Sequence, residues 1–164
     1  MFVRRGILLA LALVTVNPKT LALRVSDFPD GAKGSGVSRS LGPGGSVYSS
    51  SFNFKAGGSE ATYASEVEQI SGFRGEKALS LPRYGDRQTA NWADYKNSDG
   101  AERARAALVV LKNHVVWTLV VERCGLLAPY GCSFGPTPPK ITRAQAVAEL
   151  EKYAATLKVR VGGG

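Results

Sequence analysis

The stretch that decides the fold is Glu102–Cys124, with the sequence ERARAALVVLKNHVVWTLVVERC. It predicts two long apolar strands joined by a two-residue turn at Asn113 and His114, because asparagine tolerates the positive φ that a type I′ turn requires. The inner halves of the strands, AALVVL and VVWTLVV, do not alternate between polar and apolar residues. We therefore expect both faces of this hairpin to be covered, as in the centre of a sheet.

The position of the turn also predicts which residues face each other across the hairpin. Arg105 then lies opposite Glu122, and an opposite-charge pair of this kind stabilises a sheet by about 0.2–1 kcal/mol. The other opposed pairs are Lys112 with Val115, Val110 with Trp117, and Leu108 with Leu119. A slip of one residue would move every side chain of one strand to the other face, so we expect a specific register.

Three further strands are predicted before the hairpin. Residues 88–96 precede the turn signal Asn97–Gly100, which gives an antiparallel meander of 88–96, 102–111 and 115–124. Residues 46–54, SVYSSSFNF, place their aromatic side chains on one face at a period of two: Tyr48, Phe52 and Phe54. Residues 60–70, EATYASEVEQI, are predicted as the return strand, with Tyr63 and Val67 on one face.

A helix is predicted over residues 142–159. Thr142 and Gln145 fit a capping box, in which the cap and the third helical residue satisfy each other's backbone amides. The apolar stripe of this helix recurs every three or four residues and consists of Ala146, Leu150, Tyr153 and Leu157. The chain is therefore expected to form one α+β domain over 23–164: a largely antiparallel β-sheet of about five strands, packed on one side by this C-terminal amphipathic helix. Residues 31–46, GAKGSGVSRSLGPGGS, are expected to be a flexible Gly/Ser-rich loop.

The N-terminal residues 1–22 have the layout of a secretory signal peptide. A basic start is followed by an apolar run from Ile7 to Val16, and small residues lie near a cut site after Ala22. The run is shorter than the ~20 apolar residues that span a bilayer. We therefore expect a protein that is secreted or periplasmic/extracellular, with no transmembrane segment once the signal is removed. Without these residues the formal net charge falls from +8 to +5.

The two cysteines, Cys124 and Cys132, enclose a short loop with one proline and two glycines. In an oxidising compartment they are expected to form a disulfide bond, which would stabilise the fold by about 2–3 kcal/mol on the chain-entropy model. The sequence does not favour a metal site here, because no histidine or further cysteine lies nearby. It does not favour a redox role either, because the spacing is not C-x-x-C.

The one histidine, His114, falls at the predicted turn, which is a poor position for a catalytic base that a third group must orient. Lys33 is followed by Gly34, so the glycine-rich loop lacks the Gly-Lys-Ser/Thr of a phosphate-binding loop. The basic residues are scattered rather than gathered in a stripe with interleaved aromatics, and we expect no nucleic-acid partner. No cofactor or metal is expected.

The segment 83–96 carries the most suggestive cluster for ligand binding. Cations stand beside aromatic side chains there, a combination that binds anionic sugars, phosphates or protein surfaces. The candidate ligand-binding residues are Arg83, Tyr84, Arg87, Trp92, Tyr95 and Lys96. The alternative is that Trp92 and a tyrosine pack in the core while the charges are solvated.

Carboxylates offer a different class of function. On a strand, Glu66 and Glu68 point to the same face, and alternate strand residues meet the separation that hydrolytic carboxyl pairs need. Asp86 and Asp94 form a second candidate group in the segment before the hairpin. A small envelope hydrolase that uses such paired carboxylates is therefore the alternative to a binding protein, although no other feature of the sequence indicates a catalytic pocket.

Several short features together resemble small exported bacterial proteins of uncharacterised function. These features are Ser26–Gly31, Tyr48-x3-Phe52, Leu81-Pro82-x2-Gly85-Asp86, the apolar hairpin and the last helix. The fold of that family looks like the α/β/α sandwich of the extrinsic P subunit of photosystem II. The resemblance implies a non-catalytic binding or accessory module of the cell envelope or extracellular space, with an anionic envelope polymer or a protein as its partner.

Overall fold

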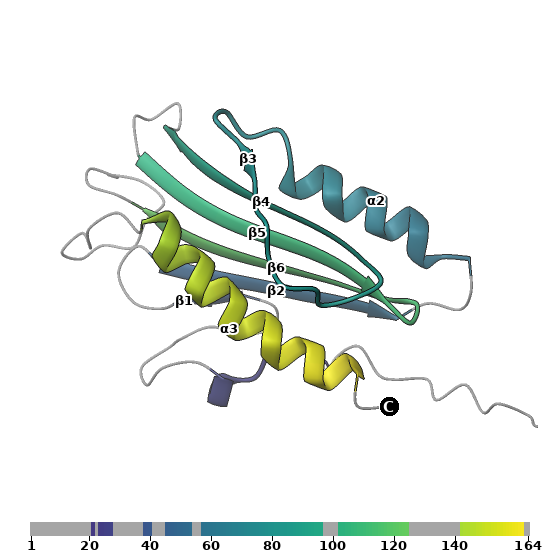
Figure 1. Cartoon of the computed structure of the whole chain (residues 1–164). Helices are drawn as coiled ribbons and strands as arrows, with labels where there is room; N and C mark the ends of the chain where they lie inside the picture. Colours follow the sequence, from purple (N-terminus) through teal and green to yellow (C-terminus); the bar gives the residue numbers. More distant parts are fainter. Residues whose placement is uncertain are drawn as a thin grey trace, which may run out of the picture.

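Six antiparallel strands form one sheet that lies between two helices (Figure 1). The computed structural model describes residues 21, 23–27, 38–40, 45–53, 57–96, 102–124 and 142–162. The order of the strands across the sheet is β1-β2-β6-β5-β4-β3. In chain order the elements are η1 (Val25–Asp27), β1 (Ser38–Ser40), β2 (Gly45–Asn53), α2 (Ser59–Ile70), β3 (Lys77–Ala78), β4 (Arg87–Lys96), β5 (Glu102–Lys112), β6 (Val115–Cys124) and α3 (Arg143–Gly162).

The predicted class, an α+β fold with a largely antiparallel sheet and a C-terminal helix, is confirmed. The number of strands differs from the expected five. Four strands are long: β2, β6, β5 and β4. The two edge strands, β1 and β3, have only three and two residues. The expected strand over residues 46–54 is β2, although its aromatic side chains lie outside the described residues. Short edge strands expose few unpaired backbone groups.

The central hairpin has the predicted turn and register. Asn113 and His114 have φ values of 50° and 63°, the left-handed conformation of a type I′ turn. All four predicted pairs are present across the hairpin: Lys112 with Val115, Val110 with Trp117, Leu108 with Leu119, and Arg105 with Glu122. The predicted meander with β4 is present as well.

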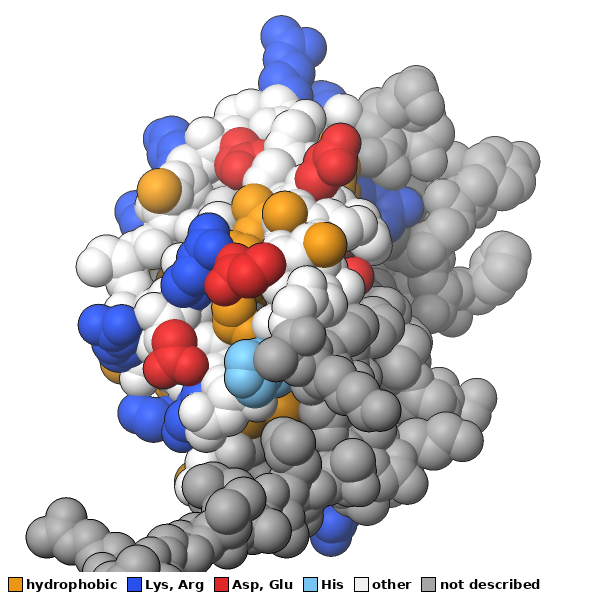
Figure 2. All heavy atoms as spheres, turned by 90° about the vertical axis from the view of Figure 1, so that its right-hand side faces the viewer, with side chains coloured by type: hydrophobic (Ala, Val, Ile, Leu, Met, Phe, Trp, Pro, Cys, Tyr) orange, Lys and Arg blue, Asp and Glu red, His pale blue; other side chains and the backbone are white. Residues whose placement is uncertain are grey.

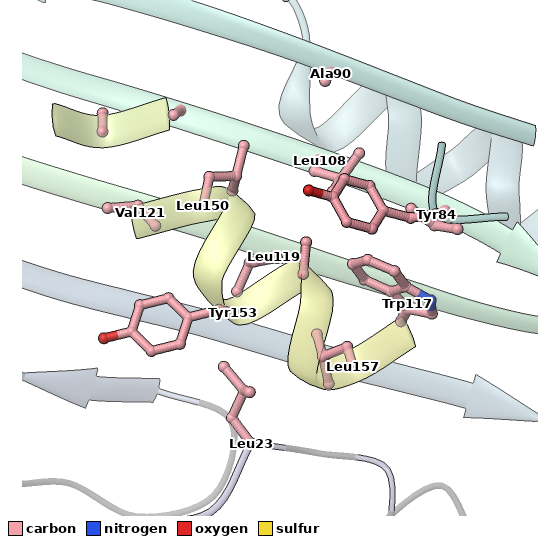
Figure 3. Packing of buried hydrophobic residues seen from close by; sticks show 14 of the residues in the cluster. Leu23, Tyr84, Ala90, Leu108, Trp117, Leu119, Val121, Leu150, Tyr153 and Leu157 are labelled. Carbon is pink, nitrogen blue, oxygen red and sulfur yellow. The ribbon is translucent and has the colours of Figure 1, made fainter. Parts of the chain in front are cut away.

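The larger core lies between the sheet and α3 (Figure 3). Thr142 and Gln145 form the predicted capping box, since the Thr142 amide donates to Gln145 Oε1 (2.9 Å) and the Gln145 amide donates to Thr142 Oγ1 (3.2 Å). The predicted stripe is fully buried against the hairpin; its members are Ala146, Leu150, Tyr153 and Leu157. On the sheet this face is built by Leu108, Trp117, Leu119 and Val121.

The N-terminal end of the described chain packs against the same core. Leu21 and Leu23 are buried in the cluster under α3. An ion pair of 2.7 Å between Asp27 and Arg160 joins η1 to the end of α3. Of the described residues, a cut after Ala22 would therefore remove Leu21, whose side chain is buried.

The opposite face of the sheet is covered by α2, which corrects the predicted return strand over 60–70. Tyr63 and Val67 are four residues apart, a spacing that places two residues on one side of a helix as well as on one face of a strand. The second core cluster joins Tyr63 and Ile70 of α2 to the hairpin residues Val109, Val116 and Val120. The sheet thus has a helix on each face, rather than on one side only.

The surface mixes charges of both signs. Figure 2 shows acidic and basic side chains interspersed at the end of the molecule where the exposed histidine lies. Within the described residues, no helix has both the length and the apolar character needed to cross a membrane.

Candidate functional site

The buried side of α2 carries a charged residue. Its buried positions are Ser59, Tyr63, Glu66 and Ile70, which follow the helical spacing of four, three and four residues. Glu66 is only 7% exposed. Acidic side chains are almost never this deeply buried unless they are paired, so Glu66 marks an unusual place in the core.

The carboxylate of Glu66 is held by two neutral groups. The Thr118 hydroxyl donates to Oε2, and Gln69 Nε2 donates to Oε1 at 3.3 Å. Thr118 is itself buried on β6. No ion pair of Glu66 with a lysine or arginine is present among the described residues. The carboxylate therefore carries hydrogen bonds but no compensating charge from this part of the chain.

Glu66 lines a pocket of about 280 Å³ between α2 and the sheet. Three residues of β6, Thr118, Val120 and Glu122, follow one another on the face beneath α2 and form one wall of it. The remaining lining comes from Gln69 and Ile70 of α2 and from Arg105 of β5. Two walls are apolar, Ile70 and Val120, whereas the others offer hydrogen-bond donors and acceptors.

The other end of the pocket holds a cation, Arg105, beside the carboxylate of Glu122. Arg103 Nη1 donates to Glu122 Oε1 at 2.7 Å, so the ion pair of Glu122 is with the diagonal neighbour, not with the directly opposed Arg105. Arg105 instead stacks on Phe73, with its guanidinium carbon 4.3 Å from the ring centroid. Burial lowers the pKa of the Arg105 guanidinium, and the carboxylate of Glu122 partly opposes this effect.

Arg105 is poorly satisfied for a half-buried cation. Its Nε is buried and has no hydrogen-bond partner. No hydrogen bond from its guanidinium to another described residue is present either, although such a group has five donors. Among the described residues, the pocket thus holds a carboxylate with no ion-pair partner at one end and a guanidinium with no hydrogen-bond acceptor at the other.

The structure does not bring the six predicted ligand-binding residues together on one surface. Trp92 and Tyr84 are buried in the core on the α3 side, where the Tyr84 ring meets Trp117 edge-on at 6.3 Å. Tyr95 is half-buried on the opposite face of the sheet and packs on Phe73. Consecutive strand residues point to opposite faces, so a cluster that is continuous in sequence is divided by β4.

The cationic members of that group lie at the surface. Arg83 donates to the carbonyl oxygens of Gly85 and Asp86, both at 2.9 Å, and Arg87 pairs with Glu60 and lies over the Tyr63 ring. Both arginines line an open groove of about 500 Å³ beside α2. The last member of the group, Lys96, is exposed at the far end of β4.

The predicted carboxylate pairs are separated. On the helix, Glu66 is buried and Glu68 is exposed, because residues two apart lie on different sides of a helix. Asp86 precedes β4 and accepts a hydrogen bond from the Asn113 amide (3.2 Å), whereas Asp94 lies eight residues further along, about 26 Å at the rise of an extended strand. Neither pair forms a catalytic dyad.

The remaining predictions concern His114, the disulfide bond and metal binding. His114 is exposed at the hairpin turn, as expected for a turn residue. The predicted disulfide involves Cys132 and the side chain of Cys124, which lie outside the described residues. In the described part of the chain, no group of three or more His, Cys, Asp or Glu side chains is placed to hold a metal ion.

Sequence reasoning missed the pocket because it missed the helix. The spacing of four residues, Ser59, Tyr63, Glu66 and Ile70, is that of the buried side of a helix. The sequence indicates this helix only if the serine and the glutamate are accepted as buried residues. The hairpin register pairs Arg105 with Glu122, and nothing in the sequence brings Glu66 to them.

A comparison of the chain with protein-family models, curated proteins and solved structures finds no match.

Proposed function

We propose that this chain is an exported, non-catalytic binding or accessory module that takes up a small ligand in the pocket beneath α2. The observation that carries the proposal is the buried Glu66 carboxylate at the wall of a cavity of about 280 Å³. Ligand pockets in proteins combine apolar walls with a few placed polar groups, and this cavity has that composition, with a volume just below their usual range of about 300–1,000 Å³. The ligand is therefore a small molecule.

Export is part of the proposal and is supported by the leader-like residues 1–22. A disulfide between Cys124 and Cys132 would fit an oxidising compartment and would secure the end of β6. The proposed resemblance to small exported bacterial proteins is supported by the helix on each face of the sheet.

Binding is favoured over hydrolysis by the state of the pocket carboxylates. Both oxygens of Glu66 accept hydrogen bonds, and Glu122 is ion-paired with Arg103. Acid–base hydrolysis needs one carboxyl kept protonated and another free to act on water or substrate. Carboxylates held in this way are better suited to fixing a ligand in place.

Equilibrium dialysis tests the proposal. The protein is dialysed against a small-molecule extract of the exporting cell's envelope, and retained compounds are identified by mass spectrometry. We expect a compound that the wild type retains and that Val120→Phe does not, because the larger ring fills the pocket. The matched control is Val159→Phe, since Val159 is 74% exposed on α3. Equal retention by both variants, or no retained compound, would contradict the proposal.

A further inference from the structure

We infer that the pocket beneath α2 takes a small zwitterion, a molecule with a cationic nitrogen for Glu66 and a carboxylate for Arg105. This inference rests on the proposed function and names the class of its ligand. It follows from two incompletely satisfied groups of opposite charge that line the same cavity.

The carboxylate of Glu66 favours a cationic nitrogen. Its two known donors, Thr118 and Gln69, are neutral, and a buried charge is costly unless it is paired. A carboxylate has about four acceptor positions, so two remain for a ligand. An ammonium or guanidinium group would supply both the missing donors and the missing charge.

The guanidinium of Arg105 favours a carboxylate. Its planar fork of donors matches a carboxylate in a bidentate geometry, and the stack on Phe73 restricts its orientation. Glu122 lies directly opposite Arg105 but is ion-paired with Arg103. The carboxylates of Glu122 and Glu76 both act on the charge of Arg105, but neither forms an ion pair with it among the described residues.

The spacing along β6 sets the length of the molecule. Thr118, beside Glu66, and Glu122, beside Arg105, are four residues apart, about 13 Å along a strand. Val120 lies between them, and Ile70 adds a second apolar wall. Because the Glu66 and Arg105 side chains both reach into this span, a ligand with several methylene groups between its two charges fits best.

Other ligand classes satisfy only one end of the pocket. A simple amine would leave the donors of Arg105 unused, and a simple carboxylate would leave Glu66 without a cation. A divalent metal is disfavoured, since three acidic or histidine ligands do not converge in the described part of the chain.

Calorimetric titration of the purified full chain with three probes of equal length tests the inference: 6-aminohexanoate, hexylamine and hexanoate. We expect 6-aminohexanoate to bind at least about tenfold more tightly than either of the others, the factor that one additional charged hydrogen bond provides. Glu66→Gln and Arg105→Lys should each weaken its binding by a similar factor. Glu68→Gln, an exposed change on the same helix, should leave binding unchanged.

The comparison of the three probes needs only the wild-type protein, so a variant that fails to fold does not affect it. Equal binding of hexylamine or of hexanoate would overturn the inference. If none of the probes binds while the wild type retains an envelope compound in dialysis, the zwitterion is wrong and the binding function stands. If dialysis also fails, both are wrong.

Discussion

The hydroxyl of Thr118 on β6 donates a hydrogen bond to the carboxylate of Glu66 on α2, across 52 residues of sequence. Both side chains are buried, with Glu66 7% and Thr118 2% exposed. The bond joins the covering helix to the central hairpin and holds Glu66 at the wall of the pocket. Its strength is therefore the first quantity to measure.

A double-mutant cycle with Thr118→Val and Glu66→Gln measures this bond. Thr118→Val should lower the free energy of unfolding by about 1–3 kcal/mol, because the buried carboxylate loses its donor. Glu66→Gln should cost less, because it also removes an unpaired buried charge. The two changes should be non-additive by about 1 kcal/mol or more, since the residues are in contact. Urea unfolding gives the energies, and additive effects would show that the bond contributes nothing.

Replacement of His114 by glycine should stabilise the hairpin. His114 has a φ of 63°, which costs a residue with a Cβ roughly 1–2 kcal/mol, whereas glycine adopts it freely. We expect a gain of about 0.5–1 kcal/mol in urea unfolding. The same replacement at the exposed Ala155, within α3, should instead cost about 1 kcal/mol. A loss of stability in His114→Gly would exclude the type I′ turn.

Replacement of Thr142 by alanine should weaken the start of α3. The change removes the oxygen that accepts from the Gln145 amide, and loss of such a cap costs about 0.5–2 kcal/mol. Thr142→Ser keeps the oxygen and serves as the control. Thermal unfolding followed by circular dichroism compares the two, and equal melting temperatures would contradict the capping box.

Alkaline pH should destabilise the fold partly through Tyr84. Burial raises the pKa of the Tyr84 hydroxyl above its ordinary value of 10.0, and the charge of Glu151 acts in the same direction. The folded state thus holds this proton more tightly than the unfolded state does. The resulting stability is present at pH values below the ordinary pKa, and it is lost as the pH rises through the pKa of the folded state. Tyr84→Phe should lose less stability than the wild type between about pH 9 and pH 11. Equal losses in urea unfolding across this range would contradict the effect.

Leu21 should contribute to stability although it precedes the predicted cut site. It is 2% exposed in the cluster under α3, and replacing a buried leucine by alanine costs about 2–5 kcal/mol. Leu21→Ala should therefore shift the urea midpoint clearly, whereas Val159→Ala at an exposed position should not. Equal midpoints for Leu21→Ala and the wild type would place Leu21 outside the core.

The hairpin and α3 could be predicted because their signals are local. The turn at Asn113 and His114 fixes every pair along the two strands, and the charges of Arg105 and Glu122 agree with it. The cap of α3 lies within four residues of sequence, from Thr142 to Gln145. Short-range rules suffice for such elements.

Helix α2 and the pocket could not be predicted in this way. Tyr63 and Val67 fit a strand and a helix equally, and a strand would place Glu66 beside Glu68 on one face. The contacts that bury Glu66 come from β6, more than fifty residues later. Tertiary packing, rather than local preference, selects the helix and builds the site.

Residues 83–96 show how composition can mislead about a surface. Trp92 and Tyr95 stand close together in sequence, but a separation of three residues sends their side chains to opposite faces of β4. Trp92 joins the core under α3, whereas Tyr95 packs on Phe73. Two members of the group, Arg83 and Arg87, do line a common groove.

The most direct test of the central claim is a nuclear magnetic resonance titration that reports where a ligand binds. The methyl groups of Ile70 and Val120 line the pocket, and that of Val159 lies at the exposed surface of α3. On addition of the envelope extract, we predict shifts of the Ile70 and Val120 methyl signals and none of Val159. Shifts confined to Val159 or absent from both pocket methyls would contradict a binding site beneath α2.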